Sequence, residues 1–177
     1  APEYREWCDG VAAGGYRDIL YAVAIAPNKL ERAAALARSG VRLTVVLDSL
    51  ELARAVAGTA LPVLIEIDSD GHRAGVRPDD ARLVAIAAEI ARGGASVAGV
   101  MTHAGASYDC RSTEAIRDMA RRERDAVVQA AKRLREAGHA APVVSVGSTP
   151  TATFIDDLSG VTEVRAGVFV FQDLVMT

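Results

Sequence analysis

A cluster of small and hydroxyl-bearing residues, Gly147-Ser148-Thr149, ends what reads as a buried strand, "VVSV". A turn of this composition that leads into a helix presents backbone N–H groups and hydroxyls, which together suit a phosphate group. The same residues could instead form only a turn and the N-cap of the next helix. The sequence therefore predicts an anion site here and leaves the structural reading open.

Further polar residues occur at or after the ends of other predicted strands. Arg73 follows "LPVLIEID", His103 ends "SVAGVMTH" and Tyr108 follows it. Taken one at a time, Arg73 could be a solvated charge, His103 a hydrogen-bonded core histidine and Tyr108 simple loop packing. Arg165, within "EVRAGVFVF", is harder to explain in this way, because a guanidinium in a buried strand needs a partner. Together these residues indicate a ligand site at one end of a sheet.

Two carboxylates, Asp68 and Asp70, also follow a predicted strand and raise the question of a metal ion. No third ligand with matching spacing is apparent, so no metal is predicted from these residues. His139 lies just past a predicted helix C-terminus, where a cation suits the helix dipole, and it receives no functional role.

These residues must be positioned by an alternation of short β-rich runs and longer helical patterns. The six predicted strands are residues 18–25, 42–47, 61–68, 96–103, 142–146 and 163–171. The predicted helices run from Asn28 as N-cap to Gly40, from Asp48 or Ser49 to near Gly58, from Pro78 to Gly93, from about Ser112 to Ala137, and over residues 150–158. No element is predicted before residue 18.

Nearly continuous apolar strands that alternate with helices indicate a parallel α/β sheet whose faces are covered. Two architectures remain open: a doubly wound open sheet, or a (β/α)8 barrel from which two units are missing. Periodicity does not choose between them. In both, ligands bind beyond the carboxyl ends of the strands, where the polar residues above collect.

Composition narrows the class of protein. The 177 residues fit one domain, and a net charge of −3 gives no support to a nucleic-acid or anionic-membrane partner. No apolar run reaches membrane-spanning length, and no signal peptide opens the chain. Cys8 and Cys110 form no C-x-x-C pair, which favours reduced thiols but leaves a single bridge open. The expectation is a cytoplasmic protein.

The motifs "VLIEIDSDGHRAGV", "THAGASYDC", "VSVGSTPT" and "EVRAGVFVFQDL" together resemble the barrel domain of the fold-type III pyridoxal-phosphate enzymes. The most similar branch contains D-threonine aldolases and D-serine dehydratases, and alanine racemase is more distant. The four motifs occur in the family's order and the resemblance covers essentially the whole chain. It implies an incomplete (β/α)8 TIM-type barrel, with six β/α units that correspond to its third to eighth strands.

The resemblance implies a phosphate cradle for pyridoxal 5'-phosphate. The turn Gly147-Ser148-Thr149 would hold the phosphate, and backbone amides of Gly167 and Val168 would complete the site. Donors fixed in advance suit a dianion because they need little reordering.

The resemblance also implies contacts to the cofactor ring. Arg73 would approach the phenolic oxygen, and His103 and Arg165 would lie near the pyridine ring and its nitrogen. Tyr108 joins the same cofactor-binding set. An arginine at the pyridine nitrogen would discourage ring protonation and weaken the electron sink.

The chain also departs from the family pattern. The family's Schiff-base lysine lies at the end of the first barrel strand, whereas Lys29 and Lys132 lie on predicted outer helices. Phe169 stands where many relatives have a tyrosine. The expectation is that residues 1–177 are a single barrel domain, a fragment without the lysine-bearing units and without the C-terminal β-domain, where a divalent metal would bind. No catalytic residue is then expected in this chain, and the fragment alone is expected to be inactive.

For the intact protein, the resemblance implies a pyridoxal-phosphate-dependent lyase that acts on a small-molecule D-amino acid. Aldol cleavage or dehydration of a D-3-hydroxyamino acid is the expected reaction, and a homodimer is the expected assembly. Three alternatives stay open: an amino-acid racemase of the same fold, a non-catalytic cofactor-binding protein, and an unrelated barrel that binds a phosphorylated metabolite.

Overall fold

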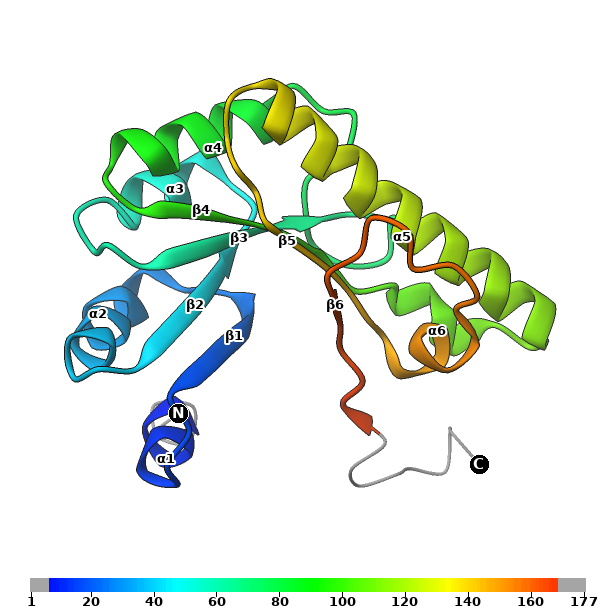
Figure 1. The fold of residues 1–177 in the computed structure, drawn as a ribbon, viewed down its shortest axis with the longest axis horizontal. Helices are drawn as coiled ribbons and strands as arrows, with labels where there is room; N and C mark the ends of the chain where they lie inside the picture. Colours follow the sequence, from blue (N-terminus) through cyan, green and yellow to red (C-terminus); the bar gives the residue numbers. More distant parts are fainter. Residues whose placement is uncertain (1–6, 169–177) are drawn as a thin grey trace.

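The computed structural model describes residues 7–168, which form a curled sheet of six parallel strands with helices on its convex side (Figure 1). The strands are β1 (Asp18–Ala24), β2 (Arg42–Leu47), β3 (Pro62–Ile67), β4 (Ser96–Thr102), β5 (Val143–Val146) and β6 (Glu163–Val164). Each strand pairs in parallel with the next one in the chain, in the order β1-β2-β3-β4-β5-β6.

This strand order decides between the two architectures. Every crossover leads to the adjacent strand in the same direction, so the right-handed rule places the connecting helices on one side of the sheet. A doubly wound sheet instead reverses its strand order at a switch point. The residues described here are therefore part of a curled half-barrel, and the prediction of six parallel β/α units is confirmed. Which barrel strands they represent stays a prediction.

The helices follow the strands in the expected alternation. They are α1 (Trp7–Ala13), α2 (Leu30–Arg38), α3 (Leu50–Ala55), α4 (Arg82–Arg92), α5 (Thr113–Glu136) and α6 (Thr149–Phe154), with short 3-10 turns η2 (Pro27–Lys29) and η3 (Gly105–Asp109). No helix among residues 7–168 is both long and apolar enough to cross a membrane. Cys8 and Cys110 are free thiols.

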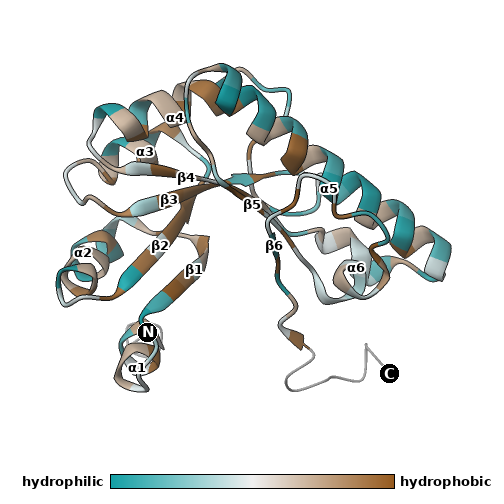
Figure 2. Ribbon diagram, in the orientation of Figure 1, coloured by the Kyte–Doolittle hydropathy of each residue, from teal (hydrophilic) through white to brown (hydrophobic). Residues whose placement is uncertain are grey.

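Strand pleating divides the apolar residues between the two faces of the sheet. Alternate residues such as Val45, Ile65 and Val144 pack with the helices in the larger cluster. The opposite face carries a much smaller cluster, centred on Val46 and Leu64 with Met101. In Figure 2 the strands β1 to β3 are mostly coloured as hydrophobic and much of α5 as hydrophilic. The sheet–helix layer is therefore the core, and the concave face is left for a site.

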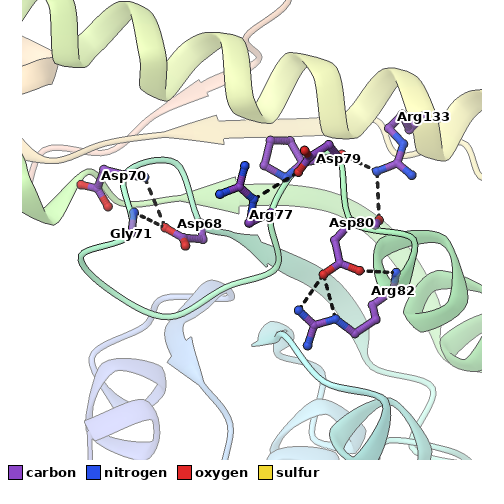
Figure 3. Close-up of polar contacts among 9 residues, drawn as sticks. Asp68, Asp70, Gly71, Arg77, Asp79, Asp80, Arg82 and Arg133 are labelled. Carbon is purple, nitrogen blue, oxygen red and sulfur yellow. Dashed lines mark hydrogen bonds and ion pairs between the residues drawn. The ribbon is translucent and has the colours of Figure 1, made fainter.

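Two helix starts differ from the prediction. Asn28 does not cap a helix: it lies inside η2, because Pro27 begins a 3-10 turn that continues into α2. Pro78 does not begin α4, which starts at Arg82. The segment before it is held as a turn, since Arg133 donates to the carbonyl oxygens of Pro78 and Asp80 (Figure 3).

Two further differences lie at the ends of the chain. The helix α1 was not predicted from the sequence, whose first residues show no clear pattern. The last strand was predicted over residues 163–171, but β6 comprises only Glu163–Val164. Residues 169–171, including Phe169, lie outside the described residues. Arg165 consequently lies just after β6, at the carboxyl edge of the sheet.

Candidate cofactor site

The loops that follow β3 and β4 are hydrogen-bonded to each other at the carboxyl edge of the sheet. Asp68 Oδ1 accepts hydrogen bonds from the amides of Asp70 (3.2 Å) and Gly71 (2.6 Å), which closes the turn after β3 (Figure 3). Asp70 Oδ2 accepts from the amide of Ala106 in the next loop at 2.9 Å. Both carboxylates therefore have structural partners. No group of three His, Cys, Asp or Glu side chains suited to a metal ion occurs in the described part of the chain.

Arg73 lies beside the loop after β4. A Cβ atom built on Gly105 would stand 2.8 Å from Arg73 Cγ and 2.7 Å from His72 Cδ2. Any side chain at position 105 would therefore require the Arg73 and His72 side chains to shift. Arg73 itself is exposed, so its guanidinium is available to a ligand at this edge.

His103 and Tyr108 form an aromatic pair at the end of β4. Their rings are stacked, with centroids 6.0 Å apart and an interplanar angle of 18°. Burial lowers the pKa of His103, and the cationic side chains of Arg73 and Arg165 lower it further. His103 is therefore a neutral imidazole near pH 7, which can accept a proton.

Arg165 reaches over the concave face of the sheet. Its Nε donates to Ser145 Oγ at 2.8 Å, and Nη2 donates to the carbonyl oxygen of Thr102. Because Val144 and Val146 pack with the helices, Ser145 and this guanidinium lie on the opposite, concave side. Burial lowers the pKa of Arg165, with Glu123, Glu163 and Glu66 acting in the opposite direction. An arginine nevertheless stays cationic, so the site holds a fixed positive charge.

The turn after β5 is held by its own side chains and by the end of β6. Ser148 is the N-cap of α6 and forms a capping box with Thr151, so the structural reading of this turn is confirmed. Thr149 Oγ1 accepts from the amide of Val168 at 3.1 Å, which brings the end of β6 against this turn. The five residues predicted for the phosphate cradle are thereby adjacent in space.

A buried carboxylate that sequence reasoning missed lies directly behind this turn. Glu123, in α5, is fully buried. Its Oε1 accepts from the amides of Ala104 (2.9 Å) and Gly147 (3.2 Å), and its Oε2 accepts from Thr151 Oγ1 (2.7 Å). The pKa of Glu123 is raised on balance, because the effect of burial exceeds that of the three hydrogen bonds and of Arg165, which lower it. The available signal was its position on the buried stripe of α5, three residues after Ala120 and three before Ala126.

The two lysines lie on the helix side of the sheet. Lys29 Nζ donates to the hydroxyl of Tyr21 at 2.7 Å, and Tyr21 packs against the sheet–helix core. Lys132 is largely exposed on α5, where it pairs with Glu136. Both ammonium groups therefore lie on the helix-covered side of the sheet, whereas Arg165 reaches over the concave side.

Six parallel strands in a curled half-barrel, with an arginine, a neutral histidine and a glycine–hydroxyl turn at their ends, are the features of an α/β barrel. Comparison with known families identifies which one. The family model described as "Alanine racemase, N-terminal domain" matches residues 11–174, and the chain belongs to that family, whose members are fold-type III pyridoxal-phosphate enzymes.

Several relatives share this domain. D-threo-3-hydroxyaspartate dehydratase of Delftia sp. (strain HT23) is 53% identical over 171 residues, which cover 93% of this chain and 45% of the relative. Its solved structure superposes with a TM-score of 0.93 at 51% identity, covering 96% of this chain and 46% of that one. D-serine dehydratase of Dictyostelium discoideum is 31% identical, covering 89% of this chain and 45% of the relative.

A solved D-threonine aldolase from Filomicrobium marinum superposes with a TM-score of 0.83 at 27% identity, covering 97% of this chain and 48% of that one. The chain thus spans about half the length of the relatives it matches.

Proposed function

We propose that residues 1–177 are the cofactor-binding barrel portion of a pyridoxal-phosphate-dependent lyase that acts on D-3-hydroxyamino acids. Dehydration of a D-3-hydroxy dicarboxylic amino acid is the favoured reaction, because the 53% identical relative is a D-threo-3-hydroxyaspartate dehydratase. Aldol cleavage, the reaction in the name of the D-threonine aldolases, is the second candidate.

The observation that carries the proposal is the open cradle between Thr149 and Gly167. A Cβ atom built on Gly167 would meet no atom of residues 7–168 within 4 Å, so within this part of the chain the backbone there is open to a ligand. Pro150 contributes no N–H group, but the amides of Thr149 and Gly167 have no hydrogen-bond partner among residues 7–168. Two free amides and a threonine hydroxyl are a donor set that fits a phosphate dianion.

The ring of the cofactor fits beside this cradle. Arg165 offers N–H donors and no acceptor, which suits an unprotonated pyridine nitrogen. When bound, pyridoxal phosphate supplies an electron sink for the negative charge left at the substrate Cα. Arg165, held by Ser145 and Thr102, would orient the ring and keep its nitrogen unprotonated. His103 would accept or return a proton at its ring nitrogen, because its lowered pKa keeps it neutral.

The proposal also includes the Schiff-base lysine, the C-terminal β-domain, the homodimer and a metal ion. The lysine that forms the Schiff base and the C-terminal β-domain would be supplied by other parts of the protein, and the homodimer stays a prediction. A divalent metal is proposed for the C-terminal domain, since one solved variant of the Delftia dehydratase is described as a metal-free form.

Product analysis tests the reaction. The protein encoded by the complete gene would be incubated with pyridoxal phosphate and D-threo-3-hydroxyaspartate. Dehydration followed by hydrolysis gives a 2-oxo dicarboxylic acid and ammonia, whereas aldol cleavage gives glycine and an aldehyde. Equal amounts of oxo acid and ammonia are expected. Glycine as the main product would replace dehydration by aldol cleavage, and no turnover of any D-3-hydroxyamino acid would contradict the proposal.

A further inference from the structure

A chain of buried hydroxyl groups links the cofactor turn to the carboxylate of Glu123. Ser107 Oγ lies 2.7 Å from Ser148 Oγ, which lies 2.9 Å from Thr151 Oγ1. Thr151 Oγ1 in turn lies 2.7 Å from Glu123 Oε2. Ser107 and Ser148 are each only 2% exposed, and Thr151 and Glu123 are fully buried. Four side chains from two successive β/α units, β4–α5 and β5–α6, thus form one hydrogen-bonded line.

The direction of every hydrogen in this line follows from the carboxylate at its end. Glu123 Oε1 already accepts from two backbone amides, and Oε2 faces the Thr151 hydroxyl. In its ionised form the carboxylate only accepts, so the single hydroxyl hydrogen of Thr151 then goes to Oε2. The carbonyl oxygen of Ser148, 3.1 Å away, is the competing acceptor, but it is farther and uncharged. Thr151 must then accept from the Ser148 hydroxyl. Ser148 must in turn accept from the Ser107 hydroxyl.

These hydrogen directions give different roles to the neighbouring hydroxyls of Ser148 and Thr149, which the sequence alone does not distinguish. The hydrogen of Ser148 is used inside the protein. Thr149 Oγ1 is outside the line and accepts from the amide of Val168, which leaves its own hydrogen for a ligand. A negative charge placed behind a phosphate site opposes binding of the dianion, so charge attraction does not explain why Glu123 is there.

We propose that Glu123 is a positioning residue, whose carboxylate fixes the direction of the Ser107–Ser148–Thr151 chain so that Thr149, not Ser148, gives a hydroxyl hydrogen to the cofactor phosphate. This inference rests on the proposed function. Glu123 also holds the amides of Ala104 and Gly147, so the loops after β4 and β5 are set by the same group. The charged side chain that acts on it from the concave side is Arg165.

Binding of pyridoxal phosphate and of unphosphorylated pyridoxal tests this assignment in the protein encoded by the complete gene. The ratio of the two dissociation constants isolates the phosphate contribution. Thr149→Ala should reduce this preference for the phosphorylated ligand about tenfold, the effect of one charge-assisted hydrogen bond. Ser148→Ala should weaken both ligands by the same factor and leave the preference unchanged. If Ser148→Ala reduced the preference for pyridoxal phosphate over pyridoxal as much as Thr149→Ala does, the assignment would be overturned.

The role of Glu123 is tested by combining these changes with Glu123→Gln. The amide of the glutamine would donate to Thr151, whose hydrogen would pass to Ser148 and release the Ser148 hydroxyl. In the Glu123→Gln protein, Thr149→Ala should reduce the preference for pyridoxal phosphate less than about threefold. The released Ser148 hydroxyl would replace the lost Thr149 hydroxyl as a donor to the phosphate. Glu136→Gln, the same change at an exposed position of α5, should keep the full tenfold effect. If Thr149→Ala still reduced the preference for pyridoxal phosphate about tenfold in the Glu123→Gln protein, Glu123 would not fix the direction of the hydroxyl chain.

Neutron diffraction gives a readout that needs neither a variant nor the cofactor. At neutral pH the hydrogens should point from Ser107 to Ser148, from Ser148 to Thr151 and from Thr151 to Glu123. A hydrogen on Glu123, or the reverse direction, would overturn the inference even if Glu123→Gln did not fold. Absence of any preference for pyridoxal phosphate in the unsubstituted protein would instead contradict the proposed function, and leave the hydrogen directions to be decided by diffraction.

Discussion

A Cβ atom built on Gly147 would stand only 2.1 Å from the carbonyl oxygen of Arg165. The backbone of Gly147 also has φ of 151°, a conformation that side-chain-bearing residues rarely adopt. This contact brings the turn after β5 and the end of β6 together, and so places Thr149 beside Gly167. The glycine in "GSTPT" is therefore required by close backbone approach, whatever the turn binds.

Gly147→Ala should destabilise the protein by about 2–5 kcal/mol, because strained backbone and overpacking act together. Urea denaturation measures this loss. Gly10→Ala is the control, since a Cβ atom there meets nothing within 4 Å and lies within α1. A Gly147→Ala protein as stable as the control would contradict the described contact.

Ser148→Ala should cost more stability than the same change at another helix N-cap. Ser112 caps α5 on the surface by accepting from the amide of Ala115 at 3.2 Å, and its loss should cost about 1 kcal/mol. Ser148→Ala removes a cap, and it also takes from the buried Ser107 hydroxyl its partner and from Thr151 one of its partners, so about 2–3 kcal/mol is expected. Equal losses in thermal denaturation would mean that the buried chain adds no stability.

His103 should make the folded state sensitive to mild acid. Its pKa is lowered on folding, chiefly by burial, so the unfolded chain binds more protons below its ordinary pKa of about 6.5. Stability is therefore complete above that pH and falls as the pH drops toward the folded-state pKa. His103→Gln should remove this part of the slope in urea denaturation below about pH 6.5. His139→Gln is the control, at a half-buried position beyond α5. It should leave the pH dependence of stability that is due to His103 unchanged. An identical slope in all three proteins would contradict the lowered pKa.

Neither lysine of this chain should carry the cofactor. Lys29 contacts Tyr21 and Lys132 pairs with Glu136, both on the helix side of the sheet, whereas Arg165 contacts Ser145 on the concave side. Borohydride reduction in the presence of pyridoxal phosphate, followed by peptide mapping, should find no specific adduct on either one. A stoichiometric adduct on Lys29 or Lys132 together with turnover would contradict the assigned orientation of the site.

The strands could be predicted because each is a short apolar run bounded by turn residues, and β2 was predicted at its observed bounds, Arg42–Leu47. Helix starts were predicted less well, since side chains far along the chain decide them: Arg133 of α5 holds the segment before α4. The loops that carry the family motifs lie beside one another, as the contacts Asp70–Ala106 and Ser107–Ser148 show.

Glu123 could not be predicted in the same way. It stands in a long helix far from every motif, and only the fold brings it behind the turn at Ser148. The sequence does show a charged residue on the buried stripe of α5. It does not show which groups that carboxylate contacts.

The most direct test of the account is a crystal structure of the protein encoded by the complete gene, with pyridoxal phosphate bound. The account predicts that the phosphate accepts from Thr149 Oγ1 and from the amides of Thr149 and Gly167, with the pyridine nitrogen facing Arg165. A phosphate bound elsewhere in the barrel, or a pyridine ring on the side of the sheet covered by the helices, would contradict it.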